Sequence, residues 1–224
     1  MLVVLIITLA SRLYKIDRPL ADWHSWRQAD TAAVARNFIK DGFNPFIPQY
    51  DDMSSQANGL DNPNRYRFVE FPVYNALVAA VWSIFGISVT SARLVTVAIT
   101  LGSTVFVYLL TRYYSGFKTA ILAAFFFATI PYNVFYSTTI LPGPLMVFGI
   151  LGLYYSFTKW LENDRKLPWF VTAILFANLA ILSWPIALFF TLPLLYLAYE
   201  KYGAQLYTRA NLIIFAIASV VPFL

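Results

Sequence analysis

The charged side chains that could carry chemistry gather in one stretch, DWHSWRQADTAAVARNF at residues 22–38. It holds the acids Asp22 and Asp30, the cation Arg27 and the only histidine of the chain, His24. A carboxylate within reach of a hydroxyl group can act as a general base, and an arginine can bind a phosphate with two hydrogen bonds. Such a set could transfer a group from a phosphate carrier, with a cation stabilising the charge of the leaving phosphate.

The rest of the chain is strongly apolar. Of its 224 residues, 59% are hydrophobic and only 12% are charged, whereas a typical soluble domain has about 25% charged residues. This composition indicates a membrane protein. The absence of cysteine excludes a disulfide framework and a thiolate metal site, and a single histidine argues against any other metal site. No basic stripe indicates a nucleic-acid partner.

Seven apolar segments predict transmembrane helices, because one span needs about 20 apolar residues. The segments are 1–16, 91–111, 119–137, 143–158, 168–183, 185–199 and 211–224. Ser183-Trp184-Pro185 divides the last long run into a hairpin, since proline interrupts a continuous helix; one long kinked helix is the alternative. The expected fold class is an all-α membrane bundle of about seven spans. Because the chain ends inside an apolar segment, we expect it to be the N-terminal part of a longer protein; a truncated protein that lacks activity is the alternative.

Arginine and lysine occupy alternate short loops. The loops that carry them are 112–118, 159–166 and 200–209. The positive-inside rule places these loops in the cytoplasm and the long loop 17–90 outside. Arg12, at the outer end of the first segment, runs against this rule. It either extends to the membrane surface along its aliphatic stem or contacts a phosphate.

The outer loop 17–90 is expected to contain the active site and two helices. A helix over about 26–40 is predicted to begin with a capping box of Ser25 and Gln28. Its periodicity places Asp30 and Asn37 on one stripe. The segment 72–86 is apolar but too short to span, so it is expected to lie at the membrane face.

Most acidic residues also lie in this outer loop rather than in the spans. An ion-coupled transporter would more often bury carboxylates at mid-membrane. Asp51, Asp52 and Asp61 could bind a divalent cation, although a solvated loop is the preferred interpretation. Simpler roles also stay open for the other charges. Asp30 and Arg27 could form a surface pair, and Arg65 and Arg67 could lie among lipid headgroups.

Four motifs resemble one known family, in the order that the family has them. They are RLYKIDRP (12–19), WRQADTAAVARNF (26–38), EFPVYNAL (70–77) and FGISVTSARLV (85–95). Together they resemble the GT-C superfamily of polytopic glycosyltransferases, in the branch of the protein O-mannosyltransferases and the lipid A aminoarabinose transferase. The resemblance implies a polyprenyl-phosphate-linked sugar as donor, a glycan, lipid or protein as acceptor, and inversion at the sugar. Apart from the weak possibility of a divalent cation, no cofactor is expected, and a prokaryotic plasma membrane is the expected location.

The catalytic residues follow from the resemblance only in part. Many members carry an Asp-Glu pair where this chain has Arg27-Gln28. We expect Asp30, then Asp22, to be the base, with Glu70 as a second acid because it precedes the loop proline. The residues expected to bind the phosphate or the sugar are Arg27, His24, Asn37, Arg65 and Arg67. The competing hypothesis is a non-catalytic membrane protein that binds lipid, or a flippase or transporter.

Overall fold

The computed structural model describes residues 1–21, 23–54, 60–162, 166–203 and 210–220. The regular elements within these ranges are helices, and an isolated antiparallel bridge between Gln49 and Tyr66 is the single β-type pairing there. The helices are α1 (Leu2–Leu13), α2 (Ser25–Lys40), α3 (Val73–Phe85), α4 (Val89–Thr129), α5 (Pro131–Tyr136), α6 (Gly143–Glu162), α7 (Leu167–Ser183), the 3₁₀ helix η1 (Pro185–Thr191), α8 (Leu192–Tyr202) and α9 (Ala210–Val220). The predicted all-α class is confirmed.

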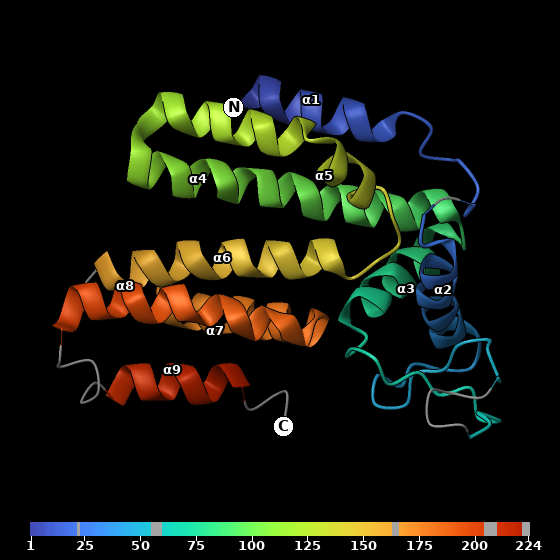
Figure 1. Ribbon diagram of the computed structural model, residues 1–224. Coiled ribbons are helices and arrows are strands. Elements are labelled where there is room, and N and C mark those ends of the chain that lie inside the picture. The colour runs from blue at the N-terminus through green and yellow to red at the C-terminus, as the bar shows by residue number, and fades with distance from the viewer. Residues whose placement is uncertain (22, 55–59, 163–165, 204–209, 221–224) are drawn as a thin grey trace.

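Most helices lie side by side in one bundle, and α2 and α3 lie at one end of it (Figure 1). The long helix α4 turns back on itself at Gly116, whose φ of 80° is a conformation that favours glycine. The bend of α4, the last turn of α6 and the last turn of α8 therefore share one end of the bundle (Figure 1). Residues 137–142 lie at the other end, with α2 and α3.

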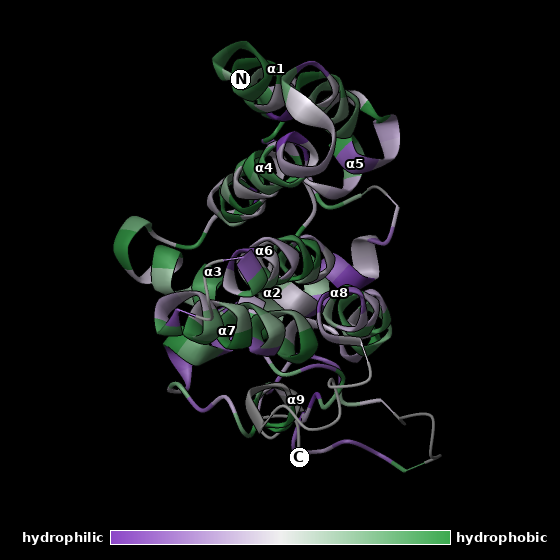
Figure 2. Ribbon diagram, turned by 90° about the vertical axis from the view of Figure 1, so that its left-hand side faces the viewer, coloured by the Kyte–Doolittle hydropathy of each residue, from purple (hydrophilic) through white to green (hydrophobic). Residues whose placement is uncertain are grey.

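The surface of the bundle is apolar. Leu122, Phe126 and Leu175 are each more than half exposed, and Figure 2 shows hydrophobic residues around α1, α4 and α7. Within the described ranges, α4 alone is long and apolar enough to cross a membrane by itself. Lipid, rather than water, suits such a surface, and the fold is that of an all-α membrane protein. The number of spans, their limits and the outward placement of 17–90 remain predictions.

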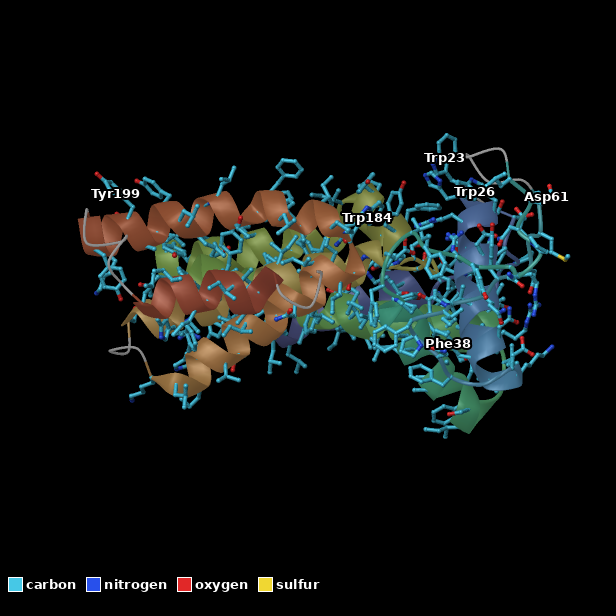
Figure 3. The ribbon with its side chains drawn as sticks, turned by 90° about the horizontal axis from the view of Figure 1, so that it is seen from below. Trp23, Trp26, Phe38, Asp61, Trp184 and Tyr199 are labelled. Atoms are coloured by element: carbon cyan, nitrogen blue, oxygen red, sulfur yellow. The ribbon has the colours of Figure 1, made fainter. Side chains whose placement is uncertain are left out.

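Helices α6 and α7 pack through small residues. A Cβ atom added at Gly149 would lie 2.8 Å from the backbone nitrogen of Ala180, and one at Gly152 would lie 2.6 Å from the ring of Phe176. Glycine at these positions lets the two backbones approach closely, as is common between membrane helices. This contact holds the part of the bundle that carries Trp184, at the end that faces α2 (Figure 3).

The buried, non-helical residues 137–140 connect α5 towards α6, and we call them the 137–140 segment. Its first two side chains bind the N-terminal part of the chain. Ser137 Oγ accepts a hydrogen bond of 2.7 Å from Arg12 Nε of α1. Thr138 Oγ1 accepts one of 3.1 Å from Arg18 Nη2, in the loop after α1.

The last two residues of the 137–140 segment bind α4 and α2 through their backbone. Thr96 of α4 donates its hydroxyl to the carbonyl of Thr139 at 2.8 Å. The backbone N–H of Ile140 donates to Gln28 Oε1 of α2 at 3.2 Å. Four consecutive residues thus join four different parts of the chain.

These contacts correct two expectations. Arg12 does not extend to the membrane surface, because its side chain is fully buried and also donates to the carbonyl of Ala128 at 2.9 Å. The capping box was also wrong. His24, in the left-handed conformation, precedes the first helical residue Ser25, and no side chain caps the helix. Gln28 bonds instead to Ile140, since a buried N–H requires an acceptor.

We expect Gly149→Ala to destabilise the protein by about 1–3 kcal/mol, because the added methyl group meets rigid backbone. Gly143→Ala, in the first turn of the same helix, is the matched control: its methyl group would make only an ordinary contact, 3.5 Å from the ring of Trp184. Thermal unfolding in detergent should give a clearly lower midpoint for Gly149→Ala than for Gly143→Ala. Equal midpoints would contradict the close contact of α6 with Ala180.

Candidate active site

A cavity of about 440 Å³ lies between the first turn of α2 and the bundle. Its walls come from α2, α4, α5, the start of α6 and the residue after α7. The aromatic and other apolar residues among them include Trp26, Phe127, Tyr132, Tyr136, Leu141, Met146, Val147 and Trp184. Arg27 is the one permanently charged side chain among the lining residues that the structure describes. The cavity can therefore hold an apolar chain with an anionic group at the α2 end.

Arg27 also belongs to a cluster of four charges beside the cavity. Its Nη2 lies 2.6 Å from Glu70 Oε2, and Arg67 Nη1 lies 3.1 Å from Asp30 Oδ2. We call Arg27, Asp30, Arg67 and Glu70 the four-charge cluster. Their side chains are only 9–25% exposed, so each pair is shielded from water. The i, i+3 surface pair of Asp30 with Arg27 is not the pairing that forms.

The environment of Asp30 suits a general base. Burial raises the pKa of the Asp30 carboxyl above its ordinary value, while the positive charges of Arg67 and Arg27 act in the opposite direction. A base with a raised pKa takes a proton more readily, provided that it is still ionised. Asp30 is not a lining residue of the cavity, and its ion pair with Arg67 holds it in the four-charge cluster.

Arg67 is held in place by an aromatic ring and keeps one donor unused. Its guanidinium lies 5.1 Å from the centre of the Tyr50 ring, within the range of a cation–π contact. Its Nη2 is buried and has no hydrogen-bond partner. A buried donor without an acceptor is costly, and an anion in the site would satisfy it.

Two of the expected binding residues, Asn37 and Arg65, lie outside both the four-charge cluster and the cavity lining. Asn37 is buried and donates from Nδ2 to the carbonyl of Gln49 at 3.1 Å, which fastens the loop onto α2. Arg65 has a positive φ of 58° and forms an ion pair of 3.5 Å with Asp41. Both contacts are structural, and neither residue lines the cavity.

His24 lines the cavity, with its ring 6.4 Å from that of Tyr136. This position agrees with a role in binding substrate. Asp22, the second choice for the base, lies outside the described residues. The structure therefore describes the surroundings of Asp30 but not those of Asp22.

The acidic residues proposed as a weak cation site are engaged elsewhere or dispersed. Asp51 accepts hydrogen bonds from Arg36 and Asn37. Asp52 Oδ1 accepts from the backbone N–H of Ser54 at 2.8 Å. Asp61 lies in the loop beyond α2 (Figure 3). In the part of the chain that the structure describes, no three such side chains come together as metal ligands.

The aromatic wall of the cavity, formed by α5 and Trp184, was not predicted from the sequence. The run PYNVFY at 131–136 supplies Tyr132, Asn133 and Tyr136 to the cavity, and Trp184 faces them from the residue after α7. Aromatic residues at the end of an apolar segment are typical of a membrane interface. That signal could have identified this wall.

The fold and the site together define an all-α membrane protein with a charged, partly buried site at one end of its bundle. Residues 62–224 match the family model described as dolichyl-phosphate-mannose-protein mannosyltransferase. Since this match covers most of the chain, the protein belongs to that family, which is a family of membrane glycosyltransferases. The resemblance to the GT-C superfamily is thus confirmed. No curated protein and no solved structure matches the chain.

The match divides the four-charge cluster. Arg67 and Glu70 lie within the matched residues, whereas Arg27 and Asp30 precede them. The ion pairs of α2 are therefore among the contacts that connect the matched part of the chain with the part before it. Their roles in catalysis are predictions.

We expect Glu70→Gln to destabilise the protein by about 1.5–3 kcal/mol, because the amide can still accept a hydrogen bond but leaves the shielded cation of Arg27 without its counter-charge. Asp51→Asn is the matched control. It removes the acid of the Arg36 pair, in which the Asp51 side chain is 53% exposed, and such pairs contribute about 0–1 kcal/mol. Unfolding in detergent measures both. A Glu70→Gln midpoint equal to that of Asp51→Asn would show that the Arg27–Glu70 pair does not hold α2.

Proposed function

We propose that this protein transfers a sugar from a polyprenyl-phosphate donor to a hydroxyl group of an acceptor on the outer side of the membrane, with inversion at the sugar. The observation that carries the proposal is the double position of Arg27, which lines the apolar cavity and also pairs with Glu70 in the four-charge cluster. An apolar cavity and an acid–base site meet at this one cation. The family match supports glycosyl transfer, and its description makes a mannosyl group the first sugar to test.

The donor would occupy the cavity with its phosphate towards α2. The isoprenoid units next to the phosphate suit the aromatic and aliphatic walls, from Phe127 to Trp184. The phosphate suits Arg27, since arginine binds phosphate oxygens with two parallel hydrogen bonds. The unused Nη2 of Arg67 would supply a further donor.

The reaction would be a single displacement at the anomeric carbon of the sugar. Asp30 takes the proton of the acceptor hydroxyl while the hydroxyl oxygen attacks the anomeric carbon from the face opposite the phosphate. The bond from the anomeric carbon to the phosphate oxygen breaks, and the polyprenyl phosphate leaves with the bonding electrons. Arg27 and Arg67 stabilise the negative charge that develops on it. Because the attack comes from the opposite face, the sugar is inverted.

Glu70 would act through Arg27 and as the second acid of the site. Its ion pair orients the guanidinium towards the cavity before the donor binds. When the phosphate forms an ion pair with Arg27 in place of Glu70, the Glu70 carboxylate becomes free to bind a sugar hydroxyl. His24, at the rim of the cavity, would bind the same sugar.

Asp30→Asn should abolish transfer while the protein still folds and binds the donor, because the amide cannot accept the hydroxyl proton. The assay incubates purified full-length protein with polyprenyl-phosphate sugars, mannosyl first, and measures release of polyprenyl phosphate. Asp51→Asn, an identical change outside the four-charge cluster, should keep most of the activity. Full activity in Asp30→Asn, Asp22→Asn and Glu70→Gln would contradict the carboxylate assignment.

The same assay decides between transfer and the competing non-catalytic function. Donor binding without turnover across a panel of polyprenyl-phosphate sugars and acceptors would favour a lipid-binding or flippase-like protein. Turnover that is lost in Asp30→Asn would favour the transferase.

Activity should also fall as the pH is lowered through the pKa of Asp30, because only the ionised carboxylate accepts a proton. Burial raises this pKa, so the fall should occur above the ordinary aspartate value of about 3.9. The positive charge of Arg67 lowers the same pKa, so Arg67→Gln should move the fall to higher pH. The pH profile of kcat/KM for the residual activity measures this shift, and a shift to lower pH would exclude Asp30 as the base.

A further inference from the structure

Gln28 lies one residue after Arg27 and is fully buried. Its Oε1 accepts the 3.2 Å hydrogen bond from the N–H of Ile140, and its Nε2 donates to the carbonyl of Trp23 at 3.4 Å. One side chain therefore binds the 137–140 segment on one side and the turn before α2 on the other. No charge is involved in either contact.

Both neighbours of this contact line the cavity. Arg27 comes directly before Gln28, and Leu141 comes directly after Ile140. The hydrogen bond between Gln28 and Ile140 thus joins two walls of the cavity, because each of the two residues is the chain neighbour of a lining residue. It therefore holds the backbone from which the Arg27 side chain extends against the wall that begins at Leu141.

We propose that Gln28 is a positioning residue that sets the width of the phosphate end of the cavity; this inference rests on the proposed function. Gln28 touches neither the donor nor the acceptor. It acts through Arg27, whose distance from the opposite wall determines whether the leaving phosphate is held by two hydrogen bonds. A shift of about 1 Å in such a group can cost a factor of about 100 in rate.

The chemistry of the glutamine side chain fits this role. The N–H of Ile140 is buried and needs an acceptor, while the carbonyl of Trp23 needs a donor. A carboxamide supplies both without adding a charge. A glutamate would offer only acceptors when ionised, and its charge would compete with Glu70 for Arg27.

Gln28→Met tests the inference because it keeps the size of the side chain and removes the hydrogen bonds to Ile140 and Trp23. We expect kcat/KM to fall by about 10- to 100-fold, with a large part of the loss in kcat, since Arg27 must meet the charge that develops on the leaving phosphate. The affinity for polyprenyl phosphate should fall by about tenfold, the effect of one mispositioned hydrogen-bond donor. The fluorescence of Trp26 and Trp184, which line the cavity, reports that binding.

Asn75→Leu is the matched control. Asn75 of α3 is also a buried amide that holds α2, through a 2.7 Å hydrogen bond from its Nδ2 to the carbonyl of Thr31. It joins α2 to α3 and does not line the cavity. The two variants should lose similar thermal stability, but only Gln28→Met should lose affinity and kcat. Equal losses of both in the two variants would show that Gln28 merely stabilises α2 and would overturn the inference.

Gln28→Glu provides a second variant if Gln28→Met does not fold. Its carboxylate can still accept from Ile140 but cannot donate to Trp23, and it adds a charge beside Arg27. Polyprenyl phosphate should therefore bind more weakly than to the unchanged protein, and unchanged affinity would overturn the inference. If the unchanged protein binds polyprenyl phosphate but transfers no sugar, the proposed function fails. The positioning role is then decided by the affinities of Gln28→Met and Asn75→Leu, and equal affinities would reject it.

Discussion

The backbone N–H and C=O groups of the 137–140 segment lie outside any helix and are buried, so they must find hydrogen-bond partners in the surrounding helices. The rest of the structure depends on these contacts. Backbone N–H and C=O groups that lie away from water need partners, and lipid offers none. In the 137–140 segment, the carbonyl of Thr139 accepts a hydrogen bond from α4 and the N–H of Ile140 donates one to α2. The side chains of Ser137 and Thr138 accept hydrogen bonds from α1 and from the loop after α1. Since the bond from Ile140 holds Gln28 of α2 against the bundle, it also places Arg27 beside the cavity. The need of a buried backbone N–H for an acceptor thus positions α2 and with it the site.

The four-charge cluster follows a similar logic on the other side of α2. Two cations and two acids that are mostly shielded from water would be costly alone, and pairing removes most of that cost. The pairs cross between α2 and the residues before α3, so the site forms only when both are in place. Because the family match begins after α2, the matched residues Arg67 and Glu70 need partners that lie before the match.

The apolar composition and the clustering of charge predicted the all-α membrane class and drew attention to α2, because hydrophobicity and local charge are properties of short stretches. Partners far along the chain could not be predicted. Arg27 and Glu70 are 43 residues apart and Gln28 and Ile140 are 112 apart, and no local rule connects them. The capping box shows the same limit. Ser25 and Gln28 satisfy the local pattern, but the glutamine side chain accepts a hydrogen bond from the buried N–H of Ile140 instead.

Arg12 has a consequence for how the protein is assembled in the membrane. It is a permanently charged side chain in an apolar helix. Thr8 and Ser11 of the same helix accept two of its hydrogen bonds, but its other acceptors are Ser137 and Ala128, which are 125 and 116 residues further along the chain. Synthesis proceeds from the N-terminal side, so α1 is made long before these two distant oxygen atoms. Until α4 and α5 arrive, Arg12 must keep its charge at the membrane surface, where water and headgroups can solvate it. The final packing of α1 therefore follows the synthesis of α4 and α5, although α1 is made before both of them.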